Sequence, residues 1–378
     1  MKIFKKAILP LGFKASGIPC GIKKSGKPDL ALFFSEVPAK AAAVFTTNSI
    51  LAAPVILCKD YLKGGNSFQA IIANSGNANC FTAKQGLKDA QETAQFLADK
   101  LGLRKESVLV ASTGIIGKKL PIDKIKSGIP KLIKHLSSSG AHQAEKAILT
   151  TDTFAKEVSV KLNIGSKLVT ICGVAKGAGM ISPNMATLLS FILTDALIAK
   201  QALNQALKAA VKDSFNCITV DGCMSTNDSV MLLANGASDS ALITNGKNLS
   251  LFIEGLSIVC LELAKMIVKD GEGASKFIKI KVVSAKNYSQ AKVVALNIAN
   301  SNLFKTAVYG QNPNFGRIAA AAGACGVKVK EEDLKIKVSS LKKKEIDVEV
   351  KLNQGKASSV VYTSDLTPEY IKINAEYN

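Results

Sequence analysis

The chain has 378 residues, of which 47% are hydrophobic and 6% aromatic, and it carries a formal net charge of +20. This length and hydrophobic content predict a globular protein of two or three structural units with a sizeable core. The sequence has no run of about 18 uncharged apolar residues, which argues against a membrane span.

The positive charge could indicate a nucleic-acid partner, but the lysines are spread along the chain and the longest run is only residues 342–344. A solvated, lysine-rich surface accounts better for this pattern, so we expect no nucleic acid. The eight cysteines form no CxxC pair, which predicts reduced thiols and no zinc site. Pro10 and Gly12 interrupt the first apolar run too early for a signal peptide, which favours a cytoplasmic protein.

Helices and short buried strands alternate over the first 275 residues. Apolar residues at helical spacing predict helices over 87–101, 198–215 and 249–268, and Gly102 is placed to end the first of them. Short apolar runs predict strands at residues 70–73, 107–111, 168–174, 188–193 and 229–234. Beyond residue 275, alternating apolar residues predict half-buried strands near 278–282, 334–338 and 346–352. We therefore expect two domains, residues 1–275 and 276–378.

The most informative segment is KGAGMISPNMATLLSFILTD, residues 176–195. A glycine-rich stretch leads to Thr187, and the predicted strand at 188–193 follows. Cleavage of the Ala186–Thr187 bond would give Thr187 a free α-amine beside its hydroxyl. An α-amine has a pKa of about 7.7–8.0, so it can serve as the general base for that hydroxyl. An ordinary loop that leads into a core strand accounts for the same spacing.

The segment GMISPNMATLLSF, residues 179–191, resembles the self-cleavage segment of the ornithine acetyltransferase family, the bifunctional glutamate N-acetyltransferases of arginine biosynthesis. Further stretches resemble that family's motifs in the same order: FTTN at 45–48, AP at 53–54, NSGNAN at 74–79, STGIIG at 112–117, TTD at 150–152, ITVDG at 218–222, STND at 225–228, DGEG at 270–273, KTA at 305–307, PNFGR at 313–317 and IN at 373–374. The resemblance therefore spans almost the whole chain.

The resemblance implies an α/β (α+β) fold: a layered α/β/β/α sandwich like that of N-terminal-nucleophile enzymes, with a smaller C-terminal α/β domain. It implies self-cleavage into an α chain, residues 1–186, and a β chain, residues 187–378, associated as a heterotetramer of two α and two β chains or a larger assembly. The implied reaction moves an acetyl group from N-acetylornithine to glutamate through acetyl-Thr187. Acetyl-CoA is a possible second donor.

The resemblance also implies roles for individual residues. Thr113 and Gly114 would supply the donors that stabilise the oxyanion, and they follow a predicted strand where glycine permits close backbone approach. The implied substrate ligands are Thr150, Lys176, Thr187, Glu272 and Asn374. Lys176 could also hold the amine of Thr187 unprotonated through charge repulsion.

The chain departs from the family pattern at its C-terminus, where Tyr377-Asn378 stands in place of a tyrosine followed by two hydroxyl residues. Asn312 and Phe315 also replace the aspartate and tryptophan that are common in the family. GVAKGAG, residues 173–179, fits neither the P-loop nor the dinucleotide pattern, so we expect no nucleotide, metal or flavin.

Two alternative functions remain open. An aminopeptidase or amidase on the same scaffold would resolve the acyl-enzyme with water instead of glutamate. A basic RNA-binding protein would bind nucleic acid in a salt-sensitive way and need no Thr187 hydroxyl.

Overall fold

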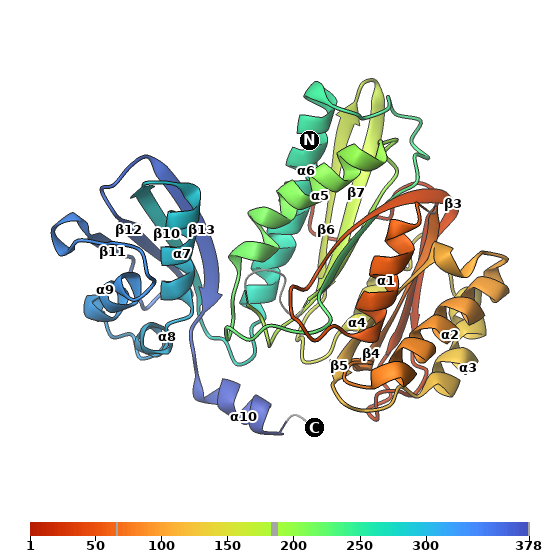
Figure 1. Cartoon of the computed structure of the whole chain (residues 1–378), viewed down its shortest axis with the longest axis horizontal. Helices are drawn as coiled ribbons and strands as arrows, with labels where there is room; N and C mark the ends of the chain where they lie inside the picture. The colour runs from red at the N-terminus through yellow and green to blue at the C-terminus, as the bar shows by residue number, and fades with distance from the viewer. Residues whose placement is uncertain (66, 183–187, 377–378) are drawn as a thin grey trace. The chain divides into compact units, whose positions relative to one another are not determined.

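The computed structural model describes residues 1–65, 67–182 and 188–376, and within them the chain forms two compact units (Figure 1). The first unit comprises the described residues among 1–177, together with 188–212 and 225–263. The second comprises 178–182, 213–224 and 264–376. This division differs from a single boundary at residue 275 because three segments of the first 275 residues belong to the second unit: 178–182, 213–224 and 264–275.

The strands of the first unit form, among the described residues, a nine-stranded sheet of order β1-β6-β7-β8-β9-β3-β4-β5, with β2 also paired to β3. The strands are β1 (Lys2–Phe4), β2 (Phe13–Ile18), β3 (Leu30–Phe45), β4 (Phe68–Asn77), β5 (Val108–Ile115), β6 (Lys156–Ile164), β7 (Lys167–Lys176), β8 (Leu189–Thr194) and β9 (Ser229–Ala234).

The long strand β3 divides this sheet into two layers. Its first part pairs with β2 and β4, its second part pairs with β9, and the register with β4 shifts between Phe34 and Ala39. Phe33 of β3 and Phe191 of β8 come from opposite layers, and their ring centroids lie 5.3 Å apart. The two layers therefore pack face to face around a shared hydrophobic core.

Helices cover the two outer faces of this sandwich. In Figure 1, α5 (Lys200–Lys212) and α6 (Gly246–Lys269) lie on the side of β6 and β7, whereas α2 (Ala83–Leu101) and α3 (Ile122–Lys134) lie on the side of β4 and β5. The remaining helices of this unit are α1 (Ala53–Lys63) and α4 (Ala141–Ile148). Gly173 permits the close approach of α6 to β7, because a Cβ there would lie 2.5 Å from Val259 Cγ1. The predicted α/β/β/α layering is confirmed.

The second unit is a smaller α/β structure. Its strands form, among the described residues, a four-stranded sheet of order β11-β12-β10-β13. The elements are β10 (Phe277–Ala285), α7 (Tyr288–Ala299), α8 (Asn302–Tyr309), α9 (Phe315–Gly323), β11 (Lys335–Val338), β12 (Glu345–Lys351), β13 (Ala357–Ser364) and α10 (Pro368–Glu376). Alternate residues of β10 and β12 are buried, as their period of two predicts.

The predicted helices over 87–101, 198–215 and 249–268 correspond to α2, α5 and α6. Gly102 ends α2 in the left-handed conformation, with φ of 67°. The predicted strand at 188–193 is β8, which begins at Leu189, two positions after Thr187 in the sequence. In the part of the chain that the structure describes, no helix is both long and apolar enough to cross a bilayer.

Candidate active site

The predicted site residues fall into three groups. Thr113, Gly114, Thr150 and Lys176 lie in the first unit, and Glu272 and Asn374 lie in the second. The predicted nucleophile Thr187 and its neighbour Ala186, which form the predicted cleavage point, lie outside the described residues.

Strand pairing brings the ends of several strands of the first unit into register. Strand β4 pairs with β5 in parallel, so Gly76 lies opposite Gly114. Strand β7 pairs with β8 in the antiparallel sense, so Lys176 lies opposite Leu189. Lys176 is therefore paired with a residue that lies two positions after Thr187 in the sequence.

The end of β5 requires glycine at position 114. Gly114 has φ of 133°, and a Cβ there would lie 2.4 Å from the carbonyl carbon of Gly76. Any side chain would collide with the backbone of the neighbouring strand, so only glycine allows β4 and β5 to approach this closely. The preceding Thr113 is 6% exposed.

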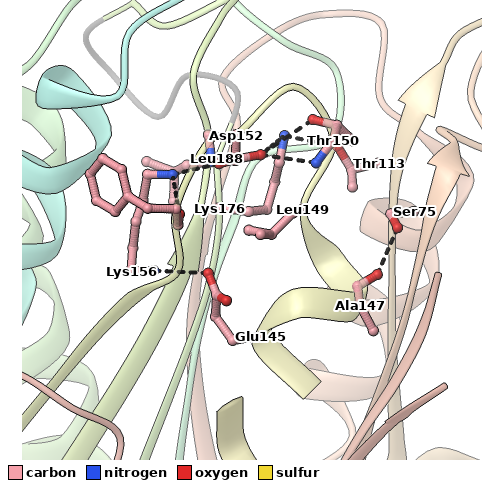
Figure 2. Close-up of polar contacts among 12 residues, drawn as sticks. Ser75, Thr113, Glu145, Ala147, Leu149, Thr150, Asp152, Lys156, Lys176 and Leu188 are labelled. Atoms are coloured by element: carbon pink, nitrogen blue, oxygen red, sulfur yellow. Dashed lines mark hydrogen bonds and ion pairs between the residues drawn. The ribbon is translucent and has the colours of Figure 1, made fainter. Parts of the chain in front are cut away.

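Lys176 connects this strand end with a buried carboxylate (Figure 2). Its side chain is 3% exposed, and its Nζ lies 3.4 Å from Thr113 Oγ1 and 4.0 Å from Asp152 Oδ2. Both partners come from segments remote in sequence. The fold thus brings two of the predicted site residues, Thr113 and Lys176, into direct contact.

Asp152 is the centre of this cluster, and its side chain is fully buried. Oδ1 accepts hydrogen bonds from Lys156 Nζ at 2.7 Å and from the Gly177 backbone N–H at 2.6 Å. Oδ2 accepts from the Thr150 backbone N–H at 2.9 Å. Burial opposes ionisation of Asp152, but the ammonium groups of Lys176 and Lys156 outweigh it and hold the pKa of this carboxyl well below its usual range.

A second carboxyl group in the cluster behaves in the opposite way. Glu145 Oε1 accepts a hydrogen bond from the Lys156 backbone N–H at 2.9 Å, and Oε2 has no hydrogen-bond partner among the described residues. Burial raises the pKa of Glu145 to about 8. Glu145 is therefore protonated at neutral pH, whereas Asp152 is charged.

Asp228 holds the start of β8. Its Oδ1 accepts a hydrogen bond from the Leu188 backbone N–H at 2.9 Å, and its side chain is buried. Burial raises the pKa of Asp228 well above its ordinary value. Asp228 therefore fixes the first described residue after Thr187.

A separate polar cluster in the second unit contains the other two predicted site residues. Asn374 Nδ2 donates to Glu272 Oε2 at 2.9 Å, although the two residues are 102 positions apart. Gly179 leaves room for the Glu272 carboxylate, because a Cβ there would lie 2.1 Å from Oε2. Asp221, which accepts from the Met180 backbone N–H at 2.6 Å and from Tyr370 Oη at 3.3 Å, belongs to the same cluster.

Sequence reasoning assigned no role to Asp152, Asp228 or Lys156. The first two end the TTD and STND motifs, so a carboxylate at the close of a short polar motif beside a buried strand was the available signal. Lys156 gave no such signal, because it begins an alternating strand where a lysine ordinarily faces solvent.

Comparison with known proteins finds relatives over nearly the whole chain. The ArgJ family model matches residues 14–378. The arginine biosynthesis bifunctional protein ArgJ of Caldanaerobacter subterraneus subsp. tengcongensis is 45% identical over 397 residues, which covers 98% of this chain and 98% of that protein. The protein of the same name from Geobacter sulfurreducens is 44% identical over 388 residues, which covers 97% and 98%.

Solved structures of similar sequence include argJ from Bacillus halodurans, which is 40% identical with a TM-score of 0.47 and covers 49% of this chain and 98% of its own. Ornithine acetyltransferase from Mycobacterium tuberculosis, complexed with ornithine, is 38% identical with a TM-score of 0.46 and covers 48% and 97%. With a family model that matches nearly every residue, and relatives about 45% identical over their full length, the chain belongs to the ArgJ family.

Proposed function

We propose that this chain is an acyltransferase of arginine biosynthesis that moves the acetyl group of N-acetylornithine to glutamate. Family membership over nearly the whole chain supports the reaction class. The observation that carries the assignment to particular atoms is the buried contact between Lys176 and Thr113, next to the start of β8.

The proposed activation step is self-cleavage at Ala186–Thr187. Thr187 Oγ attacks the Ala186 carbonyl carbon, the peptide nitrogen leaves with a proton, and an ester replaces the amide. Water then hydrolyses that ester and releases Ala186 as a carboxylate. The products are the α chain, residues 1–186, and the β chain, which begins with the free amine of Thr187.

The transfer reaction follows the same chemistry twice. The Thr187 amine removes the hydroxyl proton, Oγ attacks the acetyl carbonyl of N-acetylornithine, and ornithine leaves as the amine. The amine of glutamate then attacks the acetyl-threonine ester and regenerates the hydroxyl. In each step the Thr113 hydroxyl and the Gly114 backbone N–H stabilise the oxyanion, a role worth about 3–4 kcal/mol per donor in other acyl-transfer enzymes.

The remaining predicted residues are proposed substrate ligands. Thr150 and Lys176 suit a carboxylate, because one offers a hydroxyl and the other an ammonium group at the end of β7. Glu272 suits the side-chain ammonium of ornithine, and its hydrogen bond with Asn374 supports a joint role for the two.

Three further properties belong to the proposal. Acetyl-CoA is a second possible donor, and no nucleotide, metal or flavin cofactor is needed, because the Thr187 hydroxyl and amine supply both nucleophile and base. We propose a cytoplasmic assembly of two α and two β chains, with neither nucleic acid nor a membrane as a partner.

The test is to measure the intact mass of the purified protein and then to assay the same sample. We expect two fragments that meet at Ala186/Thr187, together with formation of N-acetylglutamate from N-acetylornithine and glutamate. Amide hydrolysis without N-acetylglutamate would instead indicate the aminopeptidase alternative. A salt-sensitive RNA complex that survives Thr187→Ala, without acetyl transfer, would indicate the RNA-binding alternative.

A further inference from the structure

The contact between Lys176 and Thr113 has a direction. A lysine ammonium group carries three donors and no acceptor. At 3.4 Å, Lys176 Nζ therefore donates to Thr113 Oγ1, and the threonine oxygen is the acceptor. The hydroxyl proton of Thr113 must point elsewhere, and it is donated to no other residue that the structure describes.

The ammonium group of Lys176 is held in place by a buried carboxylate. Asp152 Oδ2 lies 4.0 Å from Lys176 Nζ, and both side chains are buried. Asp152 is itself fixed by the backbone N–H groups of Thr150, two residues before it, and of Gly177, which follows Lys176 in the chain. A carboxylate held by backbone donors cannot follow a moving lysine, so it defines where the ammonium group rests.

We propose that Asp152 is a positioning residue that holds Lys176 against Thr113 and thereby directs the Thr113 hydroxyl proton toward the oxyanion. This inference rests on the proposed acetyl transfer. It adds an explanation of how the Thr113 hydroxyl, the oxyanion donor, is oriented. Without the lysine contact, the hydroxyl could rotate and present a lone pair to the developing negative charge. With it, the donor is oriented before the reaction, which is the condition under which such donors act most strongly.

A double-mutant cycle tests this relay, in which Asp152 acts on Thr113 through Lys176. Asp152→Asn keeps the size of the side chain and removes its charge, whereas Thr113→Val keeps the shape and removes the hydroxyl. Because the oxyanion exists only along the reaction path, each change is expected to lower kcat, by about 10-fold for Asp152→Asn and about 100-fold for Thr113→Val. If Asp152 acts through Thr113, the double variant should match Thr113→Val within about threefold.

The matched control is Glu145→Gln, another carboxyl-to-amide change in the same buried cluster. Glu145 contacts the Lys156 backbone and not Lys176, so kcat should stay within about twofold of the wild type. All rates are taken per mole of cleaved chain, as measured by intact mass, and thermal unfolding of each variant is recorded alongside.

If the fold losses of kcat in Asp152→Asn and Thr113→Val multiply in the double variant, the relay is overturned. A loss of kcat in Glu145→Gln as large as that in Asp152→Asn would also overturn it. If Asp152→Asn does not fold, Lys176→Met replaces it in the cycle, since it removes the same contact and keeps the backbone bonds of Asp152. Its kcat is then measured at saturating substrate and at a pH above the acidic limb, so that weaker substrate binding and a raised pKa of the Thr187 amine do not contribute; multiplied losses would again overturn the relay. A wild-type enzyme that forms no N-acetylglutamate would overturn the proposed function together with this inference. An active wild type with multiplied losses would overturn the relay alone.

Discussion

Three buried carboxyl groups of the first unit show how position decides charge at the scale of single residues. Asp152 lies beside two lysine ammonium groups, so it stays ionised. Glu145 and Asp228 are buried with one backbone N–H donor each and weaker cationic compensation, so their pKa values rise. The same chemical group thus has a lowered pKa at one buried position and a raised pKa at the other two.

Thr187→Ala should leave a full-length, folded and inactive precursor, because the hydroxyl is needed first for cleavage and later as the acetyl acceptor. Thr187→Ser should still cleave, since serine keeps the hydroxyl. Intact mass and circular dichroism of the two variants provide the measurement. Normal two-chain maturation of the alanine variant would contradict self-cleavage by Thr187.

Lys176→Met should move the acidic limb of the kcat profile to higher pH. The Thr187 amine must be neutral to act as a base, and a nearby ammonium group lowers its pKa. Removing that charge raises the amine pKa, so activity is lost at a higher pH as the pH falls. The measurement is kcat for acetyl transfer between pH 5 and 9.

The control for the Lys176 experiment is the double replacement of His135 and His142, which should leave the limb in place. Both side chains are exposed; His135 contacts the Lys131 carbonyl of its own helix, and His142 pairs with Glu157. If the acidic limb of the pH profile of kcat does not move in Lys176→Met, and the histidine replacements abolish activity, the general base would have to be a histidine instead.

Glu145 should make the folded protein less stable as the pH rises. Its pKa is about 8 in the folded state and near 4.5 when unfolded, so the folded state binds more protons between these values. Stability then falls with rising pH over this window, by at most about 1.4 kcal/mol per pH unit from this group. Glu145→Gln should flatten the decline in melting temperature between pH 5.5 and 8.5. Glu254→Gln, at an exposed position of α6, serves as control and should leave the decline as in the wild type.

At the scale of elements, the contact between α6 and β7 depends on a missing side chain. A Cβ at position 173 would lie 2.5 Å from Val259 Cγ1 and 2.8 Å from Leu263 Cδ1. A close-packed layer absorbs such overlap only if these side chains or the helix that carries them shift.

Gly173→Ala should therefore destabilise the protein by about 1–3 kcal/mol, the usual range for overpacking. The measurement is the midpoint of urea unfolding. Gly323→Ala is the matched control: it lies in α9, where a Cβ meets nothing within 4 Å, and helix propensity favours alanine. A Gly173→Ala protein as stable as Gly323→Ala would contradict the packing argument.

At the scale of the whole molecule, the proposed cleavage point separates strands that pair in one sheet. Strand β7 belongs to the proposed α chain and β8 to the β chain, and they pair from Ile171–Thr194 to Lys176–Leu189. Strand β9 of the β chain likewise pairs with β3 of the α chain. Separation would expose these backbone groups and the apolar core between the two layers.

The two chains should therefore stay together after cleavage. They should co-elute in size-exclusion chromatography in buffer and in 1 M salt, because backbone pairing and apolar packing, unlike exposed ion pairs, are not screened by salt. They should separate only in denaturant. Elution of the two fragments as separate peaks in 1 M salt would contradict this expectation.

The sequence by itself determined the regular elements whose cause is local. Helical spacing and a terminal glycine predicted α2, and the period of two predicted β10 and β12, because burial of one face imposes these patterns residue by residue. The motif resemblance identified Thr113, Lys176, Glu272 and Asn374 as site candidates, but without their neighbours.

Only the tertiary structure decided which of these residues meet and in what state of charge. The contact of Lys176 with Thr113 spans 63 positions, and that of Asn374 with Glu272 spans 102. Strand order and the bend of β3 produce the first contact, and no local pattern encodes either of them. Asp152 and Glu145 both carry a carboxyl group, and no local pattern in the sequence indicates that their pKa values differ. Their opposite pKa shifts arise because the folded chain places two ammonium groups beside Asp152, whereas at Glu145 the effect of burial outweighs that of the nearby Lys156.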